Sequence, residues 1–180
     1  MAQPSPSVRP GGPLYRHVAV ADSLRGRHNG AMSESGVRSR PNVLPPERGR
    51  DLPFIGRLRA SAADTNGSVE IIEYQGPAVP PPHVHREHDE IFYILEGRFS
   101  FVIGNATQEA DKGSLVWVPR GTRHGFRIQP GSKTLLVTIP AGLEGFFDEL
   151  GKGLTEGKTS DEIRATLAGK YDSIPARANE

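Results

Sequence analysis

The sequence predicts an all-β domain of the sandwich or barrel type, followed by short helices and preceded by a disordered tail. Short runs of β-branched and aromatic residues, separated by turn residues, fill the chain after Leu52. A helical spacing of apolar residues begins only after Pro140, and the residues before 47 lack an apolar pattern that could be buried. We therefore divide the 180 residues into a tail (1–46), a β-domain (47–142) and a helical extension (143–180).

The first 46 residues are rich in proline, glycine, serine and arginine, and their longest apolar patch is the short HVAVA at 17–21. This composition buries too little apolar surface to fold, so we expect disorder. The patch is too short for the apolar region of a secretory signal peptide. Since the chain has no 18-residue apolar window and no cysteine, the sequence favours a soluble cytoplasmic protein that makes no contact with a membrane.

Seven strands are predicted in the β-domain from its β-branched and aromatic runs. Gly97 and the pair Gly104-Asn105 mark hairpin turns between strands. Prolines at 77, 80, 81 and 82 forbid regular strand pairing, so a stiff loop is expected to lead into His83. The predicted strands cover residues 54–60, 69–74, 90–95, 98–103, 115–118, 124–128 and 134–139.

The extension after Pro140 is predicted to be helical. Four apolar residues recur there at i, i+3, i+4 and i+7, which places them on one helix face that can cover the β-domain. They are Leu143, Phe146, Phe147 and Leu150. Thr159 and Glu162 have the spacing of a capping box, which predicts that a second short helix begins there.

Three histidines and one glutamate of the β-domain have a spacing that can build a metal site. His83 and His85 are two residues apart, so on an extended strand their side chains leave from the same face. Glu90 stands at the start of the next predicted strand, and His124 opens the strand that follows the turn at Gly121. Imidazole and carboxylate ligands of this kind suit iron, manganese, nickel, copper or zinc.

The same residues resemble the two sequence motifs of the cupin superfamily. The first motif is matched by His83, His85, Glu90 and Gly97, and the second by Gly113, Pro119, Gly121 and His124. Two positions depart from the usual pattern: the spacing from Gly76 to His83 is one residue longer, and Ile128 stands where an asparagine often closes the second motif. Neither departure touches one of the four candidate ligands. The resemblance covers roughly residues 54 to 140 and is nearest to the quercetin dioxygenase-like group.

This resemblance implies a double-stranded β-helix, or jelly-roll barrel, that holds one divalent transition metal ion, with iron preferred. It also implies a dioxygenase that binds a small enolic or phenolic substrate and dioxygen. Glu90 would then be both a metal ligand and the catalytic base that accepts the hydroxyl proton of the substrate. Similar proteins form homodimers, and a homodimer is therefore expected.

Two other functions are compatible with the sequence. The metal could act without redox change, as a Lewis acid in an isomerase, epimerase or cyclase. The barrel could also be a small-molecule sensor or storage protein without catalysis. The formal net charge of +1 gives no indication of nucleic-acid binding. The identity of the metal distinguishes the three functions best.

The surroundings of the candidate ligands lead to two further expectations. His88 lies two residues before Glu90, and we expect it to be solvated or to contact a ligand rather than to bind the metal itself. About half of six aromatic strand residues are expected to face the metal cavity, because successive side chains alternate between the faces of a strand. They are Phe92, Tyr93, Phe99, Phe101, Trp117 and Phe126.

Overall fold

The structure is a computed structural model that describes residues 43–76 and 80–176. Of the tail predicted to be disordered (1–46), residues 1–42 lie outside the described residues, as do residues 77–79 of the proline-rich loop. The carbonyls of Leu44 and Pro45, at the end of this tail, accept hydrogen bonds from Arg59. Within the described part of the chain, no helix is both long enough and apolar enough to cross a membrane.

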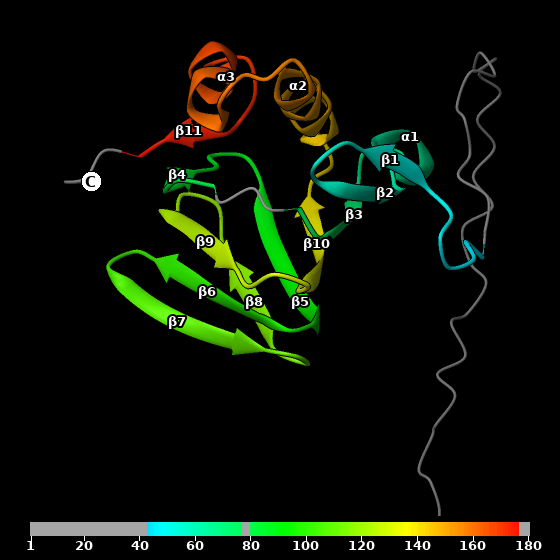
Figure 1. Ribbon diagram of the computed structural model, residues 1–180, viewed down its shortest axis with the longest axis horizontal. Coiled ribbons are helices and arrows are strands. Elements are labelled where there is room, and N and C mark those ends of the chain that lie inside the picture. Colours follow the sequence, from blue (N-terminus) through cyan, green and yellow to red (C-terminus); the bar gives the residue numbers. More distant parts are fainter. Residues whose placement is uncertain (1–42, 77–79, 177–180) are drawn as a thin grey trace, which may run out of the picture. The chain divides into compact units, whose positions relative to one another are not determined.

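The described residues form two antiparallel sheets that face each other (Figure 1). The first sheet has six strands in the order β1-β2-β3-β10-β5-β8, and the second has five in the order β11-β4-β9-β6-β7. Strands far apart in the sequence are neighbours, as in a jelly roll, because β10 lies between β3 and β5. The strands are β1 (Arg50–Leu52), β2 (Gly56–Ala60), β3 (Glu70–Tyr74), β4 (His83–Val84), β5 (Asp89–Glu96), β6 (Arg98–Ile103), β7 (Ala106–Asp111), β8 (Leu115–Val118), β9 (His124–Ile128), β10 (Lys133–Ile139) and β11 (Ile174–Pro175).

The core is aromatic and lies between the sheets. Phe92 of β5 packs edge to face on Phe101 of β6, with ring centroids 5.0 Å apart, and on Phe126 of β9 at 5.3 Å. Phe92, Phe99 and Phe101 are fully buried. Burial of such rings between two sheets supplies the main favourable free energy of folding. The predicted all-β class with short C-terminal helices is confirmed.

All seven predicted strands are present, and four more were missed. β7 was missed because five of its six residues are exposed, so it lacks an apolar pattern. β1, β4 and β11 have only two or three residues each. The strand predicted from Phe54 begins instead at Gly56, because Phe54 is an exposed turn residue with a φ of 62°.

The hairpin between β5 and β6 requires glycine at position 97. Its φ is 69°, in the left-handed region that glycine adopts without strain. A Cβ at Gly97 would lie only 2.1 Å from Oγ of Ser132. That hydroxyl accepts a hydrogen bond from the backbone N–H of Arg98 at 3.0 Å, and it would lose this hydrogen bond if it moved away.

Over residues 43–76 and 80–176, three helices accompany the sheets: α1 (Ala62–Thr65), α2 (Glu144–Thr155) and α3 (Ser160–Leu167). The predicted apolar face of α2 is buried, and the capping box of Thr159 and Glu162 opens α3 as expected. α2 and α3 pack closely, because a Cβ at Gly153 would lie 2.6 Å from Ile163. After α3 the chain does not stay helical: β11 returns to pair with β4, beside His83 (Figure 1).

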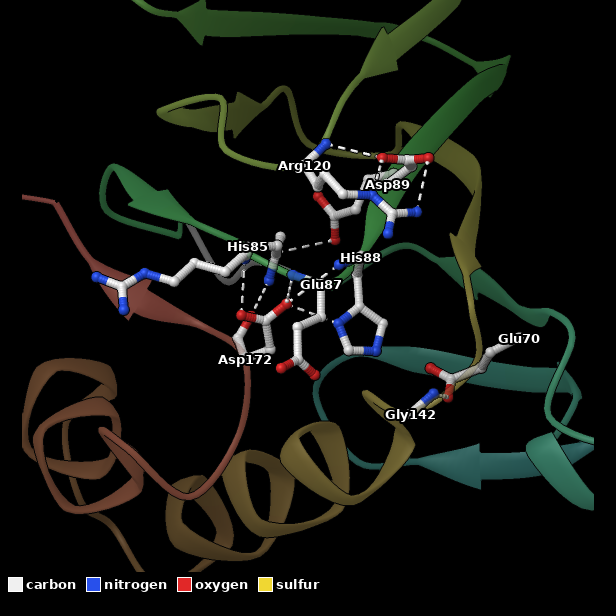
Figure 2. Close-up of polar contacts among 10 residues, drawn as sticks. Glu70, His85, Glu87, His88, Asp89, Arg120, Gly142 and Asp172 are labelled. Carbon is white, nitrogen blue, oxygen red and sulfur yellow. Dashed lines mark hydrogen bonds and ion pairs between the residues drawn. The ribbon is translucent and has the colours of Figure 1, made fainter.

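The start of α2 is capped by a carboxylate from another element. Oε2 of Glu70, on β3, accepts the backbone N–H of Glu144 at 2.8 Å. It also accepts that of Gly142 at 3.3 Å, and Figure 2 shows these two residues side by side. Its other oxygen, Oε1, is buried without a hydrogen-bond partner. Burial raises the pKa of Glu70, although these backbone N–H groups act in the opposite direction.

Glu70→Gln is expected to stabilise the protein at pH 8. The raised pKa means that Glu70 ionises less readily in the folded protein than in the unfolded chain. The contribution of its neutral form to the free energy of unfolding is therefore lost as the pH rises through the folded pKa. A glutamine keeps an acceptor for both N–H groups and carries no charge. We expect Tm to rise by roughly 2–4 °C at pH 8, the shift that about 1 kcal/mol produces in a chain of this size. The gain should disappear below about pH 4, where the glutamate is protonated in both states; a gain independent of pH would contradict this account.

Candidate metal centre

The structure brings His83, His85, Glu90 and His124 together in one buried cluster. One possible ligand atom from each of the four lies within 4.8 Å of the others. Glu90 comes from the six-stranded sheet, on β5, whereas His83 on β4 and His124 on β9 come from the five-stranded sheet. His85 follows β4 directly. The cluster therefore lies between the two sheets, and only the closed barrel assembles it.

The backbone holds the two motifs against each other. His83 and His124 are directly opposite residues of β4 and β9. The N–H of Gly121 donates to the carbonyl of His85 at 2.6 Å, which joins the second motif to the first. Arg120 and Asp89 add an ion pair at 3.0 Å between the same two segments (Figure 2). These contacts position the side chains before any ligand arrives.

Each imidazole of the cluster is oriented by its Nδ1 atom. His83 Nδ1 donates to the carbonyl of Pro81 at 2.9 Å, and His124 Nδ1 donates to that of Thr122 at 2.9 Å. His85 Nδ1 contacts the carbonyl of Asp172. A carbonyl oxygen has no hydrogen to offer, so the proton of each neutral ring must be on Nδ1. In all three neutral rings Nε2 therefore keeps its lone pair, the form in which histidine binds a metal.

The carboxylate of Glu90 lies against two of these Nε2 atoms. Its Oε2 is 2.8 Å from Nε2 of His124, and its Oε1 is 3.4 Å from Nε2 of His85. His85 Nε2 is buried and has no hydrogen-bond partner. A carboxylate oxygen and a nitrogen lone pair repel each other at this distance. The arrangement is stable only if a proton or a metal cation lies between the two atoms. Three imidazoles and one carboxylate thus fit a divalent transition metal ion.

For Glu90 and His83 the electrostatics favour the protonation states that a metal needs, whereas for His85 burial would lower the pKa but the neighbouring Glu90 raises it. For Glu90, burial alone would raise the pKa, but His85 and His124 hold it well below its usual value. Burial, together with the neighbouring His124 and His85, puts the pKa of His83 well below its ordinary value. Glu90 is therefore an anion and His83 a neutral ring near pH 7, as metal ligands must be.

His88 does not belong to the cluster and is not solvated. It is buried, and its Nδ1 donates to Oδ2 of Asp172 at 2.7 Å (Figure 2). The prediction that it is not among the ligands agrees with this placement, but the alternative of a solvated side chain is wrong. His88 is held because Asp172 reaches it from the C-terminal segment.

Asp172 is the residue that sequence reasoning missed. Its carboxylate accepts the backbone N–H groups of Arg86 and Glu87, each at 2.7 Å, and that of His88 at 3.2 Å, while its own carbonyl contacts His85 (Figure 2). Burial would raise its pKa, but these N–H groups and the ring of His88 keep the pKa of Asp172 below its usual value. One residue between α3 and β11 thus fixes the loop that joins His85 to Glu90.

Asp172→Ala is expected to weaken metal binding without removing a ligand. The loop after His85 loses its acceptor for three backbone N–H groups, so the orientation of His85 is no longer fixed. Changes to residues that orient metal ligands cost about 10- to 100-fold in metal affinity. Competition with a zinc chelator measures this, and Asp161→Ala, an exposed aspartate on α3, is the matched control. Equal zinc affinities of the two variants would contradict the role assigned to Asp172.

The cluster borders a small cavity of about 20 Å³, which is room for about one water molecule. Its wall contains His83, His85 and Glu90 on one side and residues of α2 and α3 on the other. The prediction that half of the aromatic strand residues face this cavity is wrong, since only Phe126 among the six lines it. Phe92, Phe99 and Phe101 fill the core, while Tyr93 and Trp117 are exposed on the outer face.

Comparison with known proteins agrees with this fold and cluster. Residues 70–139 match the cupin domain family. These residues form a cupin domain. The chain is 37% identical over 81 residues to a quercetin 2,3-dioxygenase of Aspergillus japonicus and 30% identical over 98 residues to one of Bacillus subtilis. The resemblance to the quercetin dioxygenase-like group is thereby confirmed.

The extent of these matches is limited. They cover 42% and 53% of this chain but only 23% and 29% of the two dioxygenases, respectively. Among solved structures, a protein from Planctomyces limnophilus is similar over 58% of this chain and 92% of its own, with a TM-score of 0.49 and 18% identity. KdgF from a Halomonas species is similar over 49% of this chain and 82% of its own, with a TM-score of 0.42 and 22% identity.

Proposed function

We propose that this cupin is a metal-dependent dioxygenase that acts on a small enolic or phenolic substrate. His83, His85, Glu90 and His124 would hold one divalent transition metal ion, with iron preferred. The observation that carries the proposal is the convergence of imidazole Nε2 atoms on the Glu90 carboxylate. The partial sequence identity to two quercetin 2,3-dioxygenases supports the choice of reaction.

A bound ion of this type would supply an open coordination position for a substrate oxygen and redox chemistry with dioxygen. The chain supplies the rest. Glu90 is anionic and buried, so it can accept the hydroxyl proton of an enol or phenol. The carbonyl groups of Pro81 and Thr122 keep His83 and His124 in the orientation and tautomer that a ligand needs. The apolar wall of the cavity excludes water from the reacting atoms.

The test combines elemental analysis with oxygen consumption. Protein purified without a histidine tag is analysed for metal, and protein reloaded with iron, manganese, nickel or copper is then assayed with an oxygen electrode against flavonols, catechols and 1,3-diketones. We expect about one ion per chain and substrate-dependent oxygen uptake with at least one metal. A metal-loaded protein that consumes no oxygen with any of these substrates would instead support a non-redox isomerase or cyclase.

The homodimer and the cytoplasmic location stay predictions from the sequence.

A further inference from the structure

Helix α3 buries an arginine in the wall of the cavity. Arg164 is only 9% exposed and shares the buried face of α3 with Ile163 and Leu167. An amphipathic helix ordinarily places apolar side chains on this face and charged ones in solvent. Burial lowers the pKa of Arg164, but a guanidinium group remains charged under all ordinary conditions. The fold therefore keeps a full positive charge inside the protein.

Tyr74, Asp161 and Glu90 act on this charge through space, but none of them forms an ion pair with Arg164. Nε of Arg164 donates to Oγ of Ser160 at 3.2 Å, and the guanidinium group lies 5.1 Å from the ring centroid of Phe146. Arginine has five N–H donors, and in the described part of the chain no other hydrogen bond and no ion pair of Arg164 is formed. Buried arginines are ordinarily paired with a carboxylate. Here no carboxylate is paired with the arginine, which instead lines the cavity.

The cavity that Arg164 lines is the one that borders the metal cluster. Glu90 lines it too, and its negative charge acts on Arg164 through space, but the two side chains form no ion pair. The remaining wall consists mostly of apolar side chains, namely Phe126, Leu136, Leu143, Phe146 and Phe147, and also contains Tyr74, Pro80 and Ser173. A ligand that complements this space has an apolar body and one anionic group that reaches the arginine.

We propose that Arg164 binds a carboxylate group of the substrate, so that the substrate is a small phenolic or enolic acid with an apolar body. The phenolic or enolic group of the substrate rests on the proposed function. The carboxylate group of the substrate is inferred from Arg164 alone. Planar guanidinium groups bind carboxylates through two parallel hydrogen bonds, which fixes the orientation of the ligand as well as its charge. A flavonol without a carboxylate would leave this buried cation unpaired.

Helix α3 carries the anion-binding residue and also closes the cavity. Because the space measures only about 20 Å³, a substrate of ten heavy atoms cannot enter unless side chains of α2 and α3 move. Return of α3 over the bound acid would bring Arg164 back to the carboxylate. The charge of the substrate would thus favour the position of α3 that closes the cavity and excludes water.

The experiment compares acids with their neutral amides by isothermal titration calorimetry at pH 8. The probes are 4-hydroxybenzoate against 4-hydroxybenzamide and benzoate against benzamide. The protein is loaded with zinc, which is inert to redox chemistry, and is also titrated free of metal. The wild type should bind the acids at least about tenfold more tightly than the amides, since a charged hydrogen-bonded pair contributes about 10- to 100-fold. Arg164→Gln should reduce this ratio to about one, and Arg164→Lys should keep part of it.

Arg127→Gln removes an exposed arginine of β9 and should leave the ratio unchanged.

If Arg164→Gln does not fold, as judged by circular dichroism, the wild type still provides the test. Its Arg164 Nε–H resonance, assigned by its loss in Arg164→Lys, should shift with 4-hydroxybenzoate and not with the amide.

A wild type without preference for acids, or a preference that persists in Arg164→Gln, would overturn the proposal. Zinc content is measured separately. A chain that fails to load zinc but keeps the Arg164-dependent preference would refute the metal function and leave this inference standing.

Discussion

His124→Ala is expected to leave the protein almost free of metal. His124 opens β9 at the centre of the cluster, is 1% exposed, and places Nε2 2.8 Å from the Glu90 carboxylate. Its removal deletes one imidazole ligand and opens a space that water fills. Metal content, measured by mass spectrometry on protein purified without a histidine tag, should fall from about one ion per chain to less than about a tenth of that value.

The matched control is His88→Ala. His88 is also a buried histidine, in the loop between β4 and β5, but it contacts Asp172 instead of the cluster. This variant should retain most of its metal, with an affinity reduced at most by the 10- to 100-fold that changes around metal ligands produce. If His88→Ala were empty and His124→Ala full, the ligand assignment would be wrong.

Glu90→Gln is expected to lower the turnover number by about 10²- to 10⁴-fold, the usual effect of removing a general base. The amide has the same shape and can still offer an oxygen to a metal, but it cannot accept the substrate's proton. Substrate binding should change much less, because the apolar wall and Arg164 are untouched. The oxygen electrode measures turnover, and the metal content of the variant is determined on the same sample.

Glu70→Gln is the control for this second experiment. It makes the same chemical change at a buried glutamate of the same sheet that caps α2 and does not line the cavity. Its turnover should equal that of the wild type. If Glu90→Gln kept full turnover with full metal content, Glu90 would not be the base, and the proton would have to leave by another path.

Much of the fold and the cluster could be predicted because the determining interactions are local in sequence. The spacing of His83 and His85 puts both on one face of an extended segment, wherever that segment lies. Gly97 marks a hairpin because its backbone has a left-handed conformation. The capping box of Thr159 and Glu162 spans three residues and needs no partner outside α3. These features follow from backbone geometry that a short stretch of chain carries by itself.

The alternation of side chains along a strand separates two faces, but it does not say what each face meets. For that reason Phe92, Phe99 and Phe101 were not distinguishable from residues that line the metal cavity. Tyr93 and Trp117 are exposed because the outer face of β5 and β8 has no cover among the described residues. Only the packing of the two sheets and of α2 and α3 decides which ring lies where.

The amino-acid sequence by itself determined the candidate ligands, the strand segments around them and the apolar face of α2. The tertiary structure alone decided that Asp172 orients His85, across 87 residues of chain, and that Arg164 enters the cavity. The physical reason is the range of the interactions. A ligand pair or a helix cap is a property of neighbouring residues, whereas the contact of a carboxylate or a guanidinium group with a distant loop exists only after the barrel has closed and β11 has paired with β4.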